Sequence, residues 1–127
     1  MNMEKVVFAF FIVLALTLNF GFVMGEIDNP DHHNAFELFA ALVVSFIATV
    51  LKFGDRTHIG AVLLATSLVA DLQLIAAVMV WGTMVYASDT GLTAKTMADI
   101  VALAGGAAVA NVASVVIFVT ETAMFRR

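Results

Sequence analysis

The sequence contains no cysteine and a single proline, Pro30, and it is poor in charge. The absence of cysteine excludes disulfides, thiolate nucleophiles, cysteine metal sites and thiol redox chemistry. Only 13% of the 127 residues are charged, whereas a soluble domain has about 25%. The few basic residues form no patch, so the sequence predicts no nucleic-acid partner.

Hydrophobic residues make up 62% of the chain, and its mean hydropathy is +1.03. A water-soluble globule of this size cannot bury so many apolar side chains, so we expect a lipid bilayer to be their solvent. A helix needs about 20 apolar residues to cross the bilayer core. Four proline-free runs meet or approach this length, at about residues 6–24, 36–53, 59–87 and 97–125.

These runs are predicted to be helices, because every backbone amide in lipid must be hydrogen-bonded within its own segment. The alternating pattern of a membrane β-strand is absent. The connections between the runs are short, which favours antiparallel neighbours. The sequence therefore predicts an all-α integral membrane protein, with a single transmembrane domain over residues 1–127 and four helices in an up-down bundle.

The basic residues predict the orientation, because Lys and Arg collect on the cytoplasmic side of a membrane. In a four-helix bundle only Lys95 falls on the side opposite the termini, and the other five share the side of the termini. The N and C termini are therefore predicted to be cytoplasmic, in a bacterial inner membrane. An alternative is a secretory signal cleaved after Gly25, which would leave three spans. The five basic residues are Lys5, Lys52, Arg56, Arg126 and Arg127.

Asp71 lies about 18 Å along the third predicted helix, near the middle of the bilayer. An Asp at this depth costs about 2.5–3.5 kcal/mol on insertion scales, which makes it a candidate for function. One interpretation is an ion or proton pathway, with Asp71 as its charge and neutral polar groups around it. The other is interhelical hydrogen bonding that only orients the bundle. The neutral groups predicted to surround Asp71 in such a pathway are Asn19, Ser45, Ser67 and Asn111. Other polar residues predicted at similar depth are Thr17, Thr49, Gln73 and Ser114.

Small residues recur at four-residue spacing in the first and fourth runs and allow another backbone to approach closely. These stripes are predicted to pack helices within the chain or between copies. Gln73 lies on a different helix face from Asp71, and three environments are open for it: contact with a second copy, contact with another helix, or simple burial. Glu121 is predicted to be a snorkelling or ion-paired residue at the helix end, near Arg126 and Arg127. The stripe residues are Ala102, Gly106 and Ala110, and Gly21 and Gly25.

The connection after the first run contains His32 and His33, with Glu37 one turn further on. Imidazole and carboxylate groups suit Zn²⁺ and related ions, so these three are weak metal candidates. Asn34 followed by Glu37 also has the pattern of a helix N-cap with its reciprocal partner, and this structural interpretation is favoured. The sequence therefore predicts no metal and no cofactor.

No catalytic constellation is present: the chain has no Gly-rich phosphate loop and no nucleophile paired with a base in sequence, so we expect no enzyme. Two hypotheses for function remain. In one, the chain forms a homo-oligomeric ion channel or an ion- or proton-coupled transport protein that uses Asp71. In the other, it is an accessory or scaffold subunit that binds a larger membrane protein and transports nothing itself.

Overall fold

The computed structural model describes residues 3–55 and 57–125, which form helices and no strand. Each of the four longer helices is long and apolar enough to cross a membrane, which confirms the prediction of an all-helical chain with four such segments. Three basic residues of the orientation argument, Arg56, Arg126 and Arg127, lie outside the described residues. The helices are α1 (Met3–Val23), the short 3₁₀ helix η1 (Pro30–His32), α2 (Ala35–Lys52), α3 (His58–Tyr86) and α4 (Ala94–Phe125).

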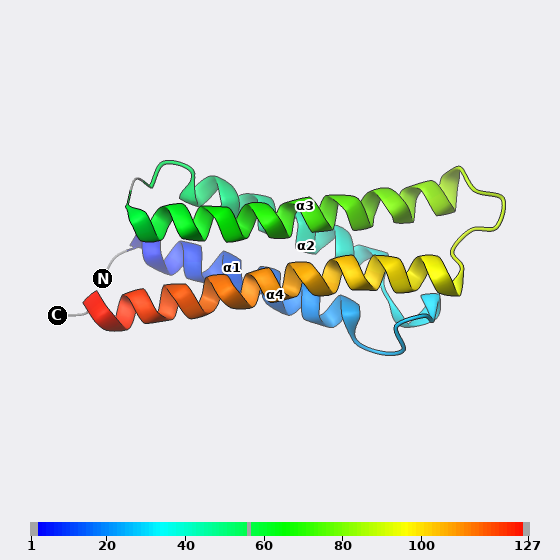
Figure 1. Cartoon of the computed structure of the whole chain (residues 1–127), viewed down its shortest axis with the longest axis horizontal. Coiled ribbons are helices and arrows are strands. Elements are labelled where there is room, and N and C mark those ends of the chain that lie inside the picture. Colours follow the sequence, from blue (N-terminus) through cyan, green and yellow to red (C-terminus); the bar gives the residue numbers. More distant parts are fainter. Residues whose placement is uncertain (1–2, 56, 126–127) are drawn as a thin grey trace.

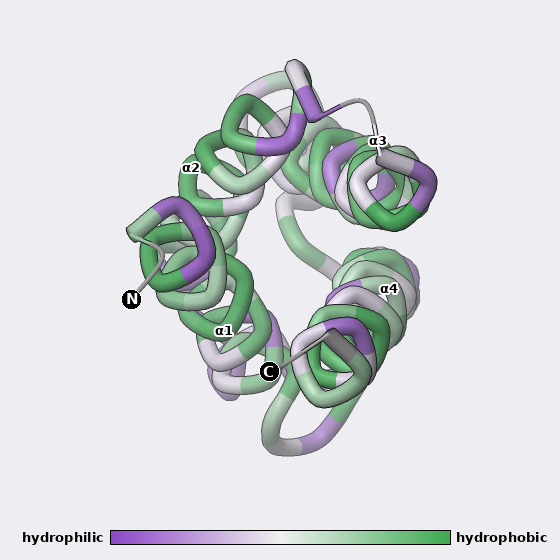
Figure 2. Tube along the Cα trace, turned by 90° about the vertical axis from the view of Figure 1, so that its left-hand side faces the viewer, coloured by the Kyte–Doolittle hydropathy of each residue, from purple (hydrophilic) through white to green (hydrophobic). Residues whose placement is uncertain are grey.

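The four long helices surround a common interior (Figure 2). α1 packs against α2 and α4, and α3 packs against the same two helices from the other side. The start of α1, the end of α4 and the α2–α3 connection lie at one end of the bundle, which we call the terminal end (Figure 1). The α1–α2 and α3–α4 connections lie at the opposite end, which we call the loop end.

Side-chain caps set where the helices begin. The Asn34 side chain accepts the N–H of Phe36 at 2.8 Å and caps α2, as the sequence predicts. Thr57 accepts the N–H of Gly60 at 2.9 Å and caps α3. The short helix η1 lies in what the sequence analysis treats as a loop, and it begins at Pro30, a residue suited to a first helical position.

The buried apolar side chains form two clusters, and one core does not run the length of the bundle. The cluster nearer the terminal end contains Phe8, Ile12, Ala48 and Leu63. The larger cluster, toward the loop end, includes Phe22, Leu38, Leu74, Met97 and Ile100. On every long helix the buried polar side chains fall between the two clusters or at their boundary. This polar layer consists of Asn19, Ser45, Thr49, Ser67, Asp71, Asn111 and Ser114.

Candidate functional site

Asp71 lies inside the bundle, with 5% of its surface exposed. Ser45 Oγ lies 2.6 Å from its Oδ1, and Thr49 Oγ1 lies 2.5 Å from its Oδ2. Thr49 Oγ1 also lies 3.0 Å from the main-chain carbonyl oxygen of Ser45. None of the ion pairs among the described residues involves Asp71. The carboxyl group is therefore held by two neutral hydroxyl groups.

Thr49 is among the polar residues that the sequence places at the depth of Asp71, but it was not predicted to be a member of the site. Ser45 and Thr49 are one turn apart on α2, so they share a helix face, and both reach the same carboxyl group. That spacing is the sequence signal that would have identified Thr49.

Three other predicted members lie in the polar layer, but none of them bonds to Asp71. Asn19, Ser67 and Asn111 are each 0% exposed. In the described part of the chain, the side-chain oxygen and nitrogen of both asparagines have no hydrogen-bond partner, and the Ser67 hydroxyl has none either. A buried polar group without a partner costs about 1–3 kcal/mol, so these groups need an explanation.

Contacts between helices show how these groups are arranged in depth. Thr66 Oγ1 lies 2.5 Å from Ser114 Oγ, which fixes the register of α3 against α4. Gln73, further along α3, packs on Gly106, which is earlier on α4, so the two helices are antiparallel. Asn111 lies one turn before Ser114. It is therefore level with the stretch of α3 that carries Ser67 and Asp71.

Asn19 is placed by the contacts of α1 with α4. Lys5 pairs with Glu121 at 2.9 Å, and the ring centroids of Phe8 and Phe118 are 5.4 Å apart, so these helices are also antiparallel. Phe8 lies level with Phe118, so in this antiparallel register Asn19 lies level with position 107 of α4. Asn111 is four residues from that position, which is about 6 Å along the bundle at 1.5 Å per residue. The unpartnered groups therefore follow one another through the interior, beside Asp71.

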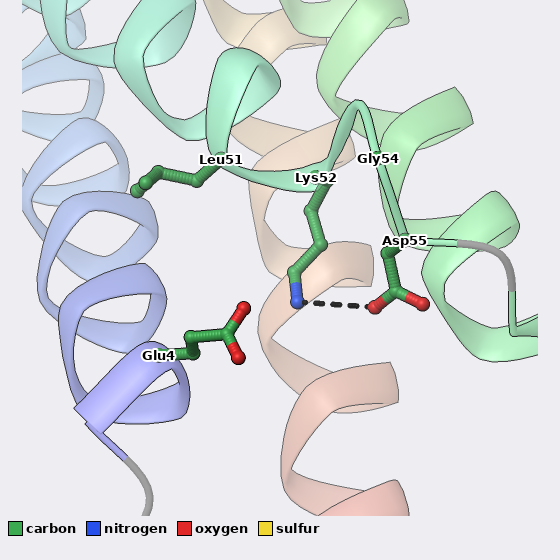
Figure 3. Close-up of a pocket in the computed structure, with 5 residues that line it drawn as sticks. All are labelled: Glu4, Leu51, Lys52, Gly54 and Asp55. Atoms are coloured by element: carbon green, nitrogen blue, oxygen red, sulfur yellow. Dashed lines mark ion pairs between the residues drawn. The ribbon is translucent and has the colours of Figure 1, made fainter.

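Charged side chains gather at the terminal end. Lys52 pairs with Asp55 at 3.5 Å, and its ammonium group lies 4.5 Å from the centroid of the Phe8 ring. Figure 3 shows Lys52 reaching toward Asp55, with the Glu4 carboxylate turned toward the same pocket of ≈ 550 Å³. Phe8 belongs to the apolar cluster beneath, which separates these charges from the polar layer. Glu121 also lies at this end and pairs with Lys5 of α1, while Arg126 and Arg127, its predicted neighbours, are outside the described residues.

Asp55 is the group in this cluster whose protonation the structure perturbs. The Thr57 hydroxyl donates to Asp55 Oδ1 at 2.7 Å and the Thr57 main-chain N–H at 2.9 Å. These two bonds favour the charged carboxylate and lower the pKa of Asp55, and nearby Lys52 lowers it further. Asp55 also touches the main chain at Gly60, where a β-carbon would collide with its carboxylate.

At the loop end the side chains of the two histidines contact main-chain atoms at the end of α1 and in the α1–α2 connection. His33, 5% exposed, has Nδ1 2.5 Å from the carbonyl oxygen of Phe22 and Nε2 2.7 Å from that of Glu26. His32 Nδ1 accepts the N–H of Glu26 at 2.9 Å. The Glu37 side chain lies over Gly21 of α1. Within residues 3–55 and 57–125, no three acidic or histidine side chains are grouped as a metal site would require.

The predicted small-residue stripes are divided by the fold. Gly25 lies beyond the end of α1 with a φ of 98°, so it does not continue a helical stripe from Gly21. Ala102 is exposed, Ala110 is buried, and Gly106 between them is covered by the Gln73 side chain of α3. The middle of the α4 stripe therefore serves packing within the chain. Gln73 itself borders an outer groove of ≈ 460 Å³ between α3 and α4, and its Oε1 has no partner among the described residues.

A family model described as "Family of unknown function (DUF6394)" matches residues 32–122. The matched segment contains α2, α3 and nearly all of α4, and with them Asp71 and its two hydroxyl partners. No curated protein and no solved structure matches the chain. The family model covers more than half of the chain, and the chain therefore belongs to the DUF6394 family.

Proposed function

We propose that this chain is an ion- or proton-transport protein of the bacterial inner membrane, with Asp71 in its pathway. The observation that carries the proposal is a membrane-depth carboxyl group whose hydrogen-bond partners in the described part of the chain are two neutral hydroxyls. Interhelical hydrogen bonds in membrane proteins contribute about 0.6 kcal/mol on average, which is less than the insertion cost of Asp. If the carboxyl group served only to link α2 to α3, its insertion into the membrane would therefore cost more free energy than its hydrogen bonds contribute.

The proposed topology is an up-down bundle with both termini in the cytoplasm. It is supported by the basic residues Lys5 and Lys52 at the terminal end, since Lys and Arg favour the cytoplasmic side. The loop end carries acidic residues, among them Asp31 and Asp89, and one lysine, Lys95.

The functional unit is proposed to be a homo-oligomer. Apolar clusters lie on both sides of the polar layer, so one bundle in this state offers no open path through its interior. Transport requires these clusters to separate, and contacts with neighbouring copies are the proposed means of supporting such a change.

The test is ion flux into proteoliposomes, with gradients of H⁺, Na⁺, K⁺ and Cl⁻ applied in turn. The wild type is expected to conduct or exchange one of these ions, and Asp71→Asn, which removes the charge and keeps the shape, is expected to abolish the flux. Asp99→Asn is the matched control, because Asp99 is an exposed acid that pairs with Lys95 at the surface. Loss of flux in both variants, or in neither, would contradict the proposed role of Asp71.

The second candidate is an accessory subunit that binds a larger membrane protein, and the Gln73 groove is the observation that favours it. The groove opens outward between α3 and α4 and is lined by Val69, Val109 and Gln73, so it is suited to receive side chains of another helix. This candidate predicts that Gln73→Leu abolishes stable association with one defined partner polypeptide, whereas Asp71→Asn leaves that association intact.

A further inference from the structure

The polar layer offers hydrogen-bond donors as well as acceptors to whatever occupies it. The unpartnered atoms are Oδ1 and Nδ2 of Asn19, Oδ1 and Nδ2 of Asn111, and the hydroxyl of Ser67. Two of these groups are amide NH₂ groups, which can only donate. All three side chains are fully buried in the bundle interior, so bulk solvent does not satisfy them.

This mixture of groups discriminates between chemical classes of ligand. A metal cation binds oxygen lone pairs and is repelled by N–H dipoles, so it would leave both NH₂ groups without a partner. Water donates and accepts, and a buried water typically makes about three hydrogen bonds to otherwise unsatisfied polar groups. The two Asp71 oxygens, the strongest cation ligands in the layer, already accept from or contact Ser45 and Thr49.

The hydrogen bonds at Asp71 fit a bound proton. Thr49 has one hydroxyl hydrogen, yet its oxygen lies within bonding distance of both Asp71 Oδ2 and the Ser45 carbonyl. If Asp71 carries a proton on Oδ2, that proton is donated to Thr49, Thr49 donates to the Ser45 carbonyl, and Ser45 donates to Asp71 Oδ1. Each of the three oxygen–oxygen contacts then contains one hydrogen atom. If Asp71 is a charged carboxylate, the hydroxyls of Ser45 and Thr49 supply only two hydrogen atoms for these three contacts.

We propose, resting on the transport function above, that the polar layer is a water-binding site and that the proton is the transported species. The water molecules are hydrogen-bonded by Asn19, Ser67 and Asn111. Asp71 binds the proton that the water molecules deliver. The proton moves between water and one carboxyl oxygen, so one O–H bond breaks as another forms, and no oxidant or other reactant is needed.

The water site is tested without measuring flux. Protein labelled with ¹⁵N-asparagine is placed in lipid nanodiscs, and magnetisation transfer from water to the side-chain NH₂ groups is recorded. The expected result is transfer to Asn19 and Asn111, assigned by the loss of one signal each in Asn19→Leu and Asn111→Leu. Absence of transfer to both amides overturns the water site.

The transported species is tested in proteoliposomes with a pH-sensitive dye inside and separate Na⁺ and K⁺ tracers. We expect proton flux without Na⁺ or K⁺ flux, at least a tenfold decrease in Asn111→Leu, and retention in Asn111→Ser, which leaves room for water. Val112→Leu, at an exposed neighbouring position, is the matched control. Flux of Na⁺ or K⁺ without protons overturns the proton assignment and leaves the transport function standing. Absence of all flux overturns the transport function and the proton assignment together, and the nanodisc measurement still decides the water site.

Discussion

Each hydroxyl at Asp71 is expected to stabilise the fold, because its removal leaves a buried carboxyl oxygen without a partner. Thr49→Val keeps the shape of the side chain and is expected to lower the free energy of unfolding by about 1–3 kcal/mol. Thr17→Val is the control, since the exposed Thr17 hydroxyl bonds only to the Leu14 carbonyl of its own helix. Thermal unfolding in detergent measures both, and equal stability of the two variants would count against the assigned contact.

The titration of Asp55 is the second prediction at this scale. Because donation from Thr57 lowers the pKa of Asp55, its midpoint is expected below 3.8. A carboxylate with a lowered pKa in the folded state contributes stability above its unfolded pKa, and this contribution is lost as the pH falls through the folded value. The start of α3 should therefore loosen in acid.

A ¹³C titration of the Asp55 carboxyl group checks this directly. Thr57→Val removes the hydroxyl donor and keeps the main-chain N–H, so the midpoint should rise toward 3.8 without passing it. A midpoint that is unchanged or falls in the variant would show that the Thr57 hydroxyl is not the main cause.

The contact between α3 and α4 depends on the absence of a side chain at Gly106, over which Gln73 lies. Gly106→Val is expected to destabilise the bundle by about 1–3 kcal/mol, because the new methyl groups displace the Gln73 amide. The cost should shrink in a Gln73→Ala background, since that change removes the colliding group. A double-mutant cycle of unfolding free energies measures the coupling, and additive effects would mean that the two residues do not touch.

Helix existence was predictable from sequence, because proline-free apolar runs of membrane-spanning length leave the backbone little alternative to a helix. The cap at Asn34 was predictable for a similar, local reason. Pairings between distant segments were not: Glu121 pairs with Lys5 at the other end of the chain, and Gln73 packs on Gly106. These contacts follow from helix register, which local patterns do not encode.

The candidate site shows the same limit. Asp71 stands out because a single acid interrupts a long apolar run, and Ser45 was expected at its depth. The sequence did not reveal that Ser45 and Thr49 occupy both carboxyl oxygens while Asn19 and Asn111 stay unpartnered. That division depends on which helices are neighbours and how far each is rotated about its axis.

For the whole molecule, the proposed topology predicts which positions are accessible from each side of the membrane. The chain has no native cysteine, so a single introduced thiol reports on its own position. In intact cells a membrane-impermeant maleimide should label Thr90→Cys, in the α3–α4 connection. His58→Cys, at the start of α3, should be labelled only after the membrane is opened. The reverse pattern would invert the orientation, and labelling of both positions in intact cells would rule out the proposed topology.

The central claim is that a carboxyl group in the bundle interior carries the function, and ion flux in proteoliposomes tests it most directly. Wild type, Asp71→Asn and Asp99→Asn are reconstituted side by side after each is shown to be folded by its unfolding transition. We predict proton flux in the wild type and in Asp99→Asn, and none in Asp71→Asn. Undiminished flux in a folded Asp71→Asn protein, or no flux in the wild type, would contradict the claim.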